Sequence, residues 1–404
     1  MRSATRALVC LLGAGAACGT ASGAAFTPGN VVVSLSQPNA EVAGDPSIAP
    51  LALAEFTPAG VATGNVISLP AADTSTLTGT NYAIVGSQSP STLYGSVKRS
   101  TDGRYMTLSA ANVPATTGTS SLPGGVFGSV GFQNRTIAVV GADGVVDTTT
   151  RFLARGTTPR GVVSTDGTSL WWAADSGSGD AGGVRYLTTG GTAAGPLLTG
   201  VGVSTASRSN TSGIGTYADQ LYVAYNVSTF RGVYTLGSGM PQSGGPLVAG
   251  LVVGGTSVTD FRFADANTLY VAVSNTDASL AGLGLQKWVS QSGSWSNVWT
   301  ANPGGALGVR SLEVSVSGTS VDVYGVTLAG TSTATPNALV KLGDTLTGAA
   351  FPAGGFTTLA TSTGGSVFRG VALAPVPEPT ALTLSLIGGA AVAAVVRVRR
   401  SRSA

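Results

Sequence analysis

Histidine is absent from the whole chain of 404 residues. Without an imidazole, the protein cannot use histidine-based acid–base catalysis, a Ser-His-Asp triad or a histidine-ligated metal. The sequence also lacks a Gly-x-x-x-x-Gly-Lys-Ser/Thr phosphate loop and a Gly-x-Ser-x-Gly nucleophile turn. Paired carboxylates that act on a glycosidic bond are still compatible with this composition.

Cysteine is almost as scarce, and Cys10 and Cys18 are its only two occurrences. Both lie in an N-terminal stretch with two arginines, an apolar run and then small residues up to Ala25, the pattern of a secretory signal peptide. We therefore expect signal peptidase to remove residues 1–25 and the mature chain to begin at Phe26. That chain contains no cysteine, so it has neither disulfides nor thiol chemistry.

Cys18 leaves a second interpretation of the same stretch open. A lipoprotein signal would place a diacylglyceryl group on this cysteine after cleavage. Such signals usually have Leu, Val or Ile three residues before the cysteine, whereas Gly15 stands there in this chain. The ordinary signal peptide is therefore favoured.

Charge is sparse, at 10% of all residues. Six of the 21 Lys and Arg residues lie in the terminal segments, so residues 26–379 keep 15 basic against 18 acidic residues, a net charge of −3. Nucleic acids and anionic membrane surfaces both require a basic footprint on their partner. The body is therefore not expected to bind nucleic acid.

The residues that are abundant favour β-structure. Glycine contributes 59 residues, and Ser, Thr, Ala and Val are frequent, while no amphipathic helical pattern runs through the body. Such a composition fits many short strands joined by tight turns. It differs from the charged, proline-rich composition of a disordered chain.

A short unit recurs along the body: a strand that begins with arginine or glycine, a turn with Asp or Gly, and a second strand rich in aromatic residues. Five copies occur, at residues 95–109, 160–174, 213–225, 261–273 and 312–324. Their turn residues Asp102, Asp166, Asp219, Asp265 and Gly318 are 64, 53, 46 and 53 residues apart. A period near 50 residues, with about four strands per unit, is typical of propeller blades.

The two ends of the body contain strands that would close such a ring. Residues 367–374 resemble one more first strand, and the other three strands of a blade are expected at residues 30–35, 51–56 and 66–69. Pairing the N-terminal strand with the C-terminal one would remove exposed sheet edges. The sequence thus predicts an all-β propeller of about six blades over residues 26–374, or seven if residues 70–95 or 110–130 hold another. A pair of β-sandwiches or a β-helix is the alternative.

The C-terminal segment 375–404 has three parts. Pro377, Glu378 and Pro379 come first, and the two prolines keep this stretch extended. An uncharged, mostly apolar run of 17 residues follows at 380–396, which as a helix would span ~25 Å, near the lower limit for crossing a membrane. The basic tail 397–404 contains four arginines that would stay on the cytoplasmic side: Arg397, Arg399, Arg400 and Arg402.

This order of Pro-Glu-Pro, apolar helix and arginine cluster resembles the PEP-CTERM sorting signal of bacterial envelope proteins. The resemblance covers only Pro375 to Ala404. It implies recognition of the Pro-Glu-Pro motif by an exosortase, a membrane enzyme of the cysteine-peptidase type, and it implies export and a link with exopolysaccharide production. An ordinary C-terminal anchor is the simpler alternative.

Two weaker patterns point to ligand binding by the body. Trp288, Trp295 and Trp299 lie close together, and the last two share strand parity, which would place them on one face as a platform for sugar rings. Packing between blades is the alternative role for these tryptophans. Asp175 and Asp180 flank a Gly/Ser loop that could hold Ca²⁺, although the spacing and closing glutamate of a calcium loop are missing and a plain turn is simpler.

Together these features predict an exported, non-catalytic protein of the cell envelope or extracellular matrix, anchored in the membrane as a precursor and sorted through its tail. Its expected partners are signal peptidase, exosortase, the membrane and an extracellular polysaccharide, and no cofactor is expected. The alternatives are a carbohydrate-binding protein that uses exposed aromatics and a carboxylate-dependent propeller enzyme. Glycan binding lost on Trp→Ala exchange would favour the first alternative, and turnover lost on Asp→Asn exchange the second.

If residues 1–25 are removed, the exported protein should contain no thiol. Titration of the denatured protein with a thiol reagent should give no signal above the blank, and reduction should leave its electrophoretic mobility unchanged. Mass spectrometry should show a chain that begins near Phe26. A diacylglyceryl group on Cys18 would contradict this prediction and identify a lipoprotein.

Overall fold

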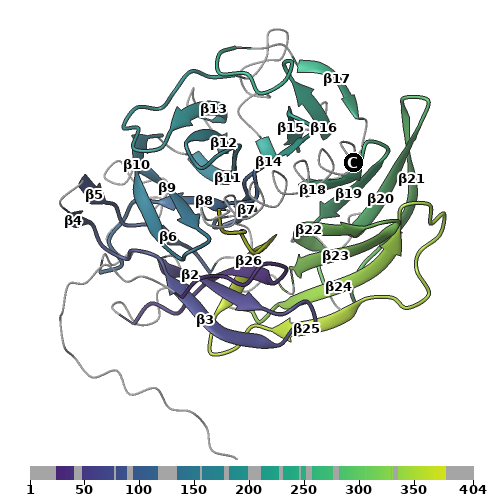
Figure 1. Ribbon diagram of the computed structural model, residues 1–404, viewed down its shortest axis with the longest axis horizontal. Helices are drawn as coiled ribbons and strands as arrows, with labels where there is room; N and C mark the ends of the chain where they lie inside the picture. The colour runs from purple at the N-terminus through teal and green to yellow at the C-terminus, as the bar shows by residue number, and fades with distance from the viewer. Residues whose placement is uncertain are drawn as a thin grey trace, which may run out of the picture.

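The computed structural model is built of β-strands throughout its described part. It describes residues 24–378 except 41–47, 77–78, 89–93, 117–133, 155–156, 177–181, 199–210, 227–230, 245–246, 252–256, 276–281, 305, 329 and 331–334. Within these residues the sheets are arranged around a common centre, so the protein is all-β and propeller-like (Figure 1). None of the described residues form a helix long and apolar enough to span a membrane. Most of the expected signal peptide, and the apolar run 380–396, lie outside the described residues.

Four separate sheets have strands in chain order, each antiparallel to the next. The first contains β11 (Thr157–Ser164), β12 (Ser169–Ser176) and β13 (Gly183–Thr188). The second contains β14 (Thr211–Tyr217), β15 (Gln220–Tyr225), β16 (Gly232–Leu236) and β17 (Leu247–Leu251). The third contains β18 (Val258–Asp265), β19 (Thr268–Val273), β20 (Gly284–Gln291) and β21 (Ser294–Ala301), and the fourth β22 (Val309–Ser317), β23 (Ser320–Thr327), β24 (Ala338–Thr345) and β25 (Thr357–Thr361).

A nine-stranded sheet completes the ring. One part of it is the antiparallel series β26 (Val367–Leu373), β1 (Val31–Ser36), β2 (Ala49–Phe56) and β3 (Ala62–Ser68). The other is the series β7 (Lys98–Arg99), β8 (Tyr105–Ala111), β9 (Asn134–Gly141) and β10 (Val146–Leu153). The short strand β6 (Val85–Gly86) joins β2 to β8, and a small hairpin of β4 (Thr74–Thr76) and β5 (Gly79–Asn81) lies beside them.

The predicted closure of the ring is confirmed. β1 lies between β2 and β26 and is antiparallel to both, with Val31 opposite Leu373 and Val33 opposite Val371. All six residues of β1 are buried. Because β1 and β26 come from opposite ends of the body, their pairing removes the two edges that an open ring of sheets would expose.

The recurring unit of the sequence forms the first two strands of successive sheets, as expected. In its turns Asp102, Asp166 and Asp265 each accept a hydrogen bond from a backbone amide two residues later. Such side-chain contacts replace backbone bonds that a tight turn cannot make. Asp219 and Gly318 adopt left-handed backbone angles, with φ of 57° and 60°.

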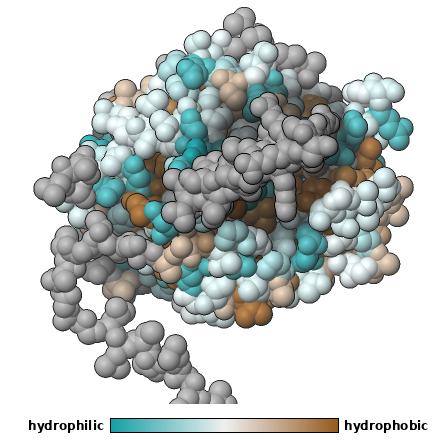
Figure 2. Space-filling model, in the orientation of Figure 1, coloured by the Kyte–Doolittle hydropathy of each residue, from teal (hydrophilic) through white to brown (hydrophobic). Residues whose placement is uncertain are grey.

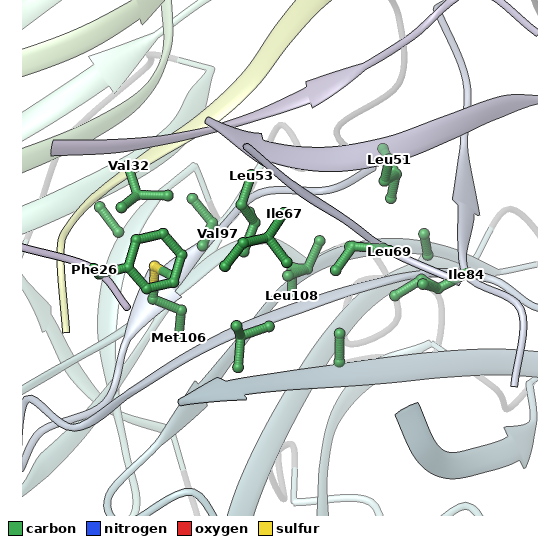
Figure 3. Close-up of a cluster of buried hydrophobic side chains, with 14 of the residues drawn as sticks. Phe26, Val32, Leu51, Leu53, Ile67, Leu69, Ile84, Val97, Met106 and Leu108 are labelled. Carbon is green, nitrogen blue, oxygen red and sulfur yellow. The ribbon is translucent and has the colours of Figure 1, made fainter. Parts of the chain in front are cut away.

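Hydrophobic clusters fill the space between neighbouring sheets. In the cluster of Figure 3, Val32, Leu53 and Leu108 come from β1, β2 and β8, so it packs the two series of the nine-stranded sheet against each other. Phe26, the expected first residue of the mature chain, is 2% exposed in this cluster, and its amide donates to the Ala142 carbonyl at 2.9 Å. On the face shown in Figure 2, the rim is mostly hydrophilic or weakly hydrophobic, with scattered hydrophobic patches.

Closure of the ring should be essential for stability. Val33 is fully buried in β1, so Val33→Asp places an unpaired charge between β2 and β26. Urea unfolding should show a loss of about 3–5 kcal/mol in the free energy of unfolding. The control Val66→Asp, at a position 51% exposed in β3, should change it by less than about 0.5 kcal/mol. Equal effects of the two exchanges would show that the pairing of β1 with β26 does not hold the ring together.

Candidate functional site

The strand nearest the centre carries a β-bulge near its start in five places around the ring. In each, two residues of the inner strand lie opposite one residue of its neighbour. The extra residues are Arg160 in β11, Ser212 in β14, Thr259 in β18, Arg310 in β22 and Arg369 in β26. A bulge redirects the side chain of its extra residue away from the regular alternation of the strand.

The residue after each bulge lies close to the next inner strand. A Cβ at Gly370 would lie 2.6 Å from the Val97 amide nitrogen, so only glycine fits there. Asp260 instead accepts hydrogen bonds from the Leu312 amide at 3.0 Å and the Ser311 hydroxyl at 3.1 Å. Side-chain and backbone contacts of this kind tie the inner strands into one ring.

Three of the five bulge residues are arginines, which we call the arginine cluster (Arg160, Arg310 and Arg369). Arg310 and Arg369 are 2% and 1% exposed. Burial and the charge of Arg160 lower the pKa of Arg310 to about 10, and burial and the charge of Arg310 lower that of Arg369. β11 and β22 lie on different sides of the centre (Figure 1).

Tyr94 and Arg135 border the arginine cluster. The Tyr94 hydroxyl donates to the Thr158 hydroxyl at 3.4 Å, and burial raises the pKa of this phenol to about 12 despite the nearby charges of Arg135 and Arg160. Arg135 donates through Nε and Nη2 to the Thr157 carbonyl at 3.1 and 2.6 Å. Burial lowers the pKa of Arg135 to about 10. Because its pKa is raised, the Tyr94 phenol stays protonated at neutral pH and its hydroxyl donates to Thr158.

A buried ion network also lies across the axis. Lys98 of β7 pairs with Asp260 of β18, and both side chains are almost fully buried at 2% and 1% exposure. Arg262 lies 3.6 Å from Asp260 and donates to Glu313 of β22 at 3.2 Å. The network therefore connects three inner strands from different parts of the ring.

Burial shifts the protonation equilibria of this network. It lowers the pKa of Lys98 to about 8, with the charge of Arg262 acting in the same direction. Burial alone would raise the pKa of Asp260, but the charges of Lys98 and Arg262 outweigh it and hold that pKa below its ordinary value. Asp260 is therefore an anion at neutral pH, and it cannot act as a proton donor there.

The three tryptophans do not form one surface. Lys287 lies opposite Trp299 and Trp288 opposite Asn297, so Val298 is the extra residue of a bulge in β21. The bulge makes the expectation of shared parity wrong. Trp299 is buried against Tyr270 and Phe351, whereas Trp295 is half-buried against Phe263 on the other face, in the cluster that also contains Trp288.

Of the two residues expected to bind calcium, Asp175 and Asp180, only Asp175 lies among the described residues. The Asp175 carboxylate binds the Arg160 guanidinium at 2.7 Å, and Asp180 lies outside the described residues. Within the described part of the chain, no group of three or more carboxylates is placed to hold a metal ion.

The start of the Pro-Glu-Pro segment, Pro377 and Glu378, lies on the surface beside the turn between β7 and β8. After β26, the Val376 amide donates to the Gly103 carbonyl at 2.8 Å, and the exposed Glu378 pairs with Arg104. Arg104 also binds Asp102 of the same turn at 2.6 Å. Pro379 and the four tail arginines lie outside the described residues.

The sequence signal for the arginine cluster was present but incomplete. Arg160-Gly-Val, Arg310-Ser-Leu and Arg369-Gly-Val each open an inner strand, and the recurring unit was described as beginning with arginine or glycine. The pattern did not reveal that these arginines occupy bulges. Strand alternation assigns each residue to one of two faces, and an inserted residue breaks that rule.

Comparisons with known proteins do not assign a function to this site. No family model matches the chain, and no curated protein matches it. The hydrazine synthase of Kuenenia stuttgartiensis is similar at 13% identity over 63% of each chain, with a TM-score of 0.36. The Hadza microbial sialidase Hz136 is 12% identical over 80% of this chain and 65% of its own, with a TM-score of 0.47. This chain thus matches less than two thirds of the length of either protein, and likenesses this weak carry no argument.

Removal of the charge on Asp260 should destabilise the protein in a pH-dependent way. At pH 7, Asp260→Asn leaves Lys98 buried without its counter-charge and should cost about 3–5 kcal/mol in the free energy of unfolding. Because the folded-state pKa of Asp260 lies below its unfolded value, the wild-type contribution is complete above about pH 4 and is lost as the pH falls through the folded pKa. The difference between wild type and variant should therefore narrow in acid.

The matched control is Asp322→Asn. Asp322 pairs with Lys341 at 2.8 Å on the surface, with side chains 43% and 26% exposed. Loss of this pair should cost no more than ~1 kcal/mol. Equal losses in the two variants at pH 7 would contradict a structural role for the axial ion network.

Proposed function

We propose that the protein is an exported, non-catalytic component of the cell envelope or extracellular matrix. Its body is a rigid propeller, and its C-terminal segment is a PEP-CTERM sorting signal that an exosortase recognises. The observation that carries this proposal is the position of the motif. Pro377 and Glu378 are the first exposed residues after the ring-closing strand β26, so the motif begins where the folded body ends.

The proposed body has six blades. In this interpretation the nine-stranded sheet represents two blades, β26–β1–β2–β3 and β7–β8–β9–β10, which β6 joins, and the four separate sheets represent the others. The first of these two blades combines strands from both ends of the body. The motif would then follow directly from the blade that closes the ring.

A non-catalytic role is supported by the state of the central carboxylates. Glycoside hydrolysis by paired carboxylates requires one acid with a raised pKa. The pKa of Asp260 is instead lowered, although burial opposes this, by the charges of Lys98 and Arg262. Glu313 and Asp175 are each bound by an arginine, Arg262 and Arg160. These carboxylates therefore balance buried cations.

The Glu378–Arg104 pair supports a motif that stays available to an enzyme. The two side chains are 64% and 35% exposed. An ion pair this exposed contributes at most ~1 kcal/mol. The body therefore positions the motif beside the turn between β7 and β8. The contact is weak enough for an enzyme that binds Glu378 to displace Arg104.

The motif can be tested in the native host by exchange of Pro377, Glu378 and Pro379 for alanine together. Export and membrane insertion should be unchanged, because the apolar run 380–396 is untouched. Removal of the tail should stop, and the precursor should accumulate in the membrane at its uncleaved mass. Immunoblots of membrane and medium fractions would measure this. Processing and release like the wild type would contradict the sorting role and leave an ordinary anchor.

Two further variants separate recognition from positioning and orientation. Arg104→Ala removes the ion pair with Glu378 but keeps the motif, and it should be processed normally. Replacement of the four tail arginines by alanine should instead loosen retention of the precursor before cleavage, because the short helix loses its cytoplasmic charge.

A further inference from the structure

We propose that Glu55 binds the new amino terminus that forms when the expected signal peptide, residues 1–25, is removed. The α-ammonium group of Phe26 is then the counter-charge of a buried carboxylate, and its binding strengthens closure of the ring. This role rests on export, which is part of the proposed function, but it does not involve the C-terminal motif.

The boundary between exposed and buried chain coincides with the expected cleavage site. Ala24 and Ala25 are exposed, whereas Phe26 is 2% exposed in the hydrophobic cluster of Figure 3. The Phe26 amide donates to the Ala142 carbonyl at 2.9 Å. Of the described residues, cleavage after Ala25 therefore removes only exposed ones, and the first anchored residue becomes the terminus.

The carboxylate of Glu55 lies beside this terminus. Glu55 belongs to β2 and is 2% exposed. Its Oε1 accepts hydrogen bonds from the Thr27 amide at 2.7 Å and the Asn30 side-chain amide at 2.9 Å. Its Oε2 accepts from the Asn65 side-chain amide at 3.0 Å and the Thr63 hydroxyl at 3.3 Å. The carboxylate thus joins the N-terminal segment to β3.

The charge of Glu55 has no cation opposite it among the described side chains. All four donors are neutral, and no ion pair found in the described part of the chain includes Glu55. Burial raises the pKa of Glu55, but the four hydrogen bonds outweigh burial and hold that pKa below its ordinary value. The carboxylate is therefore an anion at neutral pH, and buried charges are usually paired.

The nitrogen of Phe26 is close enough to supply the cation. Two consecutive backbone nitrogens are less than ~3.8 Å apart, so this nitrogen lies within ~6.5 Å of Glu55 Oε1. Hydrolysis of the Ala25–Phe26 peptide bond consumes one water and leaves a carboxylate on Ala25 and an amine on Phe26. An α-amino group has a pKa of ~8, so the amine takes up a proton and is mostly ammonium at pH 7.

Cleavage also opens the approach to Oε2 of Glu55. Before cleavage, the Asn65 side-chain amide donates to the Ala24 carbonyl at 3.1 Å and the Ala25 carbonyl at 3.4 Å. Removal of these two residues takes away the atoms beside Asn65. An ammonium group has three N–H donors, so it can keep the bond to the Ala142 carbonyl and direct another donor to Glu55.

The same carboxylate is connected to the ring-closing strands. The Asn30 side chain donates to Glu55, and the Asn30 carbonyl accepts from the Ala374 amide at 2.8 Å, directly after β26. An ion pair at Phe26 therefore adds to the contacts that hold β1 between β2 and β26. The uncleaved precursor lacks this pair, because its Phe26 nitrogen belongs to a neutral peptide bond.

The test is a thermodynamic cycle on the protein in detergent. Chains 26–404 and 22–404 are released from an N-terminal fusion by a protease that leaves no extra residue, each with Glu55 and with Glu55→Gln. The melting temperature of 26–404 relative to 22–404 should be at least ~2 °C more favourable with Glu55 than with Glu55→Gln. The cycle cancels the contacts of Ala24 and Ala25 themselves.

The matched control is Asp322→Asn, since Asp322 is 43% exposed in a surface pair. It should leave the difference between the two chains unchanged. An effect of chain length that is the same with Glu55 and with Glu55→Gln would overturn the ion pair.

A second measurement requires no substitution, so it remains decisive if Glu55→Gln fails to fold. Acetic anhydride acylates uncharged, accessible amines, and mass spectrometry of the N-terminal peptide measures the rate. In the folded chains, the α-amine of Phe26 in 26–404 should react at least tenfold more slowly than that of Ser22 in 22–404. Equal rates would show that the terminus is not bound and would overturn the proposal.

The first residue of the exported protein separates this role from sorting. Mass spectrometry should find Phe26 first. Another first residue, together with normal removal of the C-terminal tail, would overturn the role of Glu55 in maturation and leave the sorting proposal intact. A chain kept in the cell with residues 1–25 attached would contradict export, and with it both proposals.

Discussion

The antiparallel pairing of β1 with β26 is the contact on which the rest of the structure depends. These strands come from opposite ends of the body, so their pairing is possible only when all the intervening sheets are in place. The same pairing brings Gly370 against the backbone of Ser96 and Val97 and joins the last inner strand to β7. Contacts so distant in sequence are costly to form and slow to find. In return they cover the edges of β1 and β26 that an open ring would expose, and they fix the inner strands in one ring.

The ring of inner strands allows this body, which has few charged residues, to bury several of them as ion pairs at its centre. Lys98 and Asp260 pair across the axis, and Arg262 and Glu313 extend the network to β22. Ions can be buried only where the surrounding backbone holds their partners in place, because an uncompensated ion in the interior is strongly destabilising.

The body and the tail meet at the turn between β7 and β8. Val376 is held by a backbone hydrogen bond to Gly103, whereas Glu378, two residues later, is held only by an exposed ion pair. The contacts that fix the chain to the body therefore become weaker within a few residues after β26. Under the proposed function, in which a membrane enzyme processes the tail, this arrangement would keep the motif outside the folded body while β26 remains paired in its sheet.

The sequence by itself determined the repeated two-strand unit, its turns and the closing strands, because these depend on local alternation, turn residues and a period near 50 residues. It also determined that histidine and thiol chemistry are excluded from the body, since this follows from composition. Only the tertiary structure decided where the interior charges lie. The prediction that Trp295 and Trp299 lie on one face of their strand was wrong, because the bulge at Val298 places them on opposite faces. The arginines at 160, 310 and 369 were visible as residues, but their positions as the extra residues of bulges depend on the strand pairing, which no local pattern records.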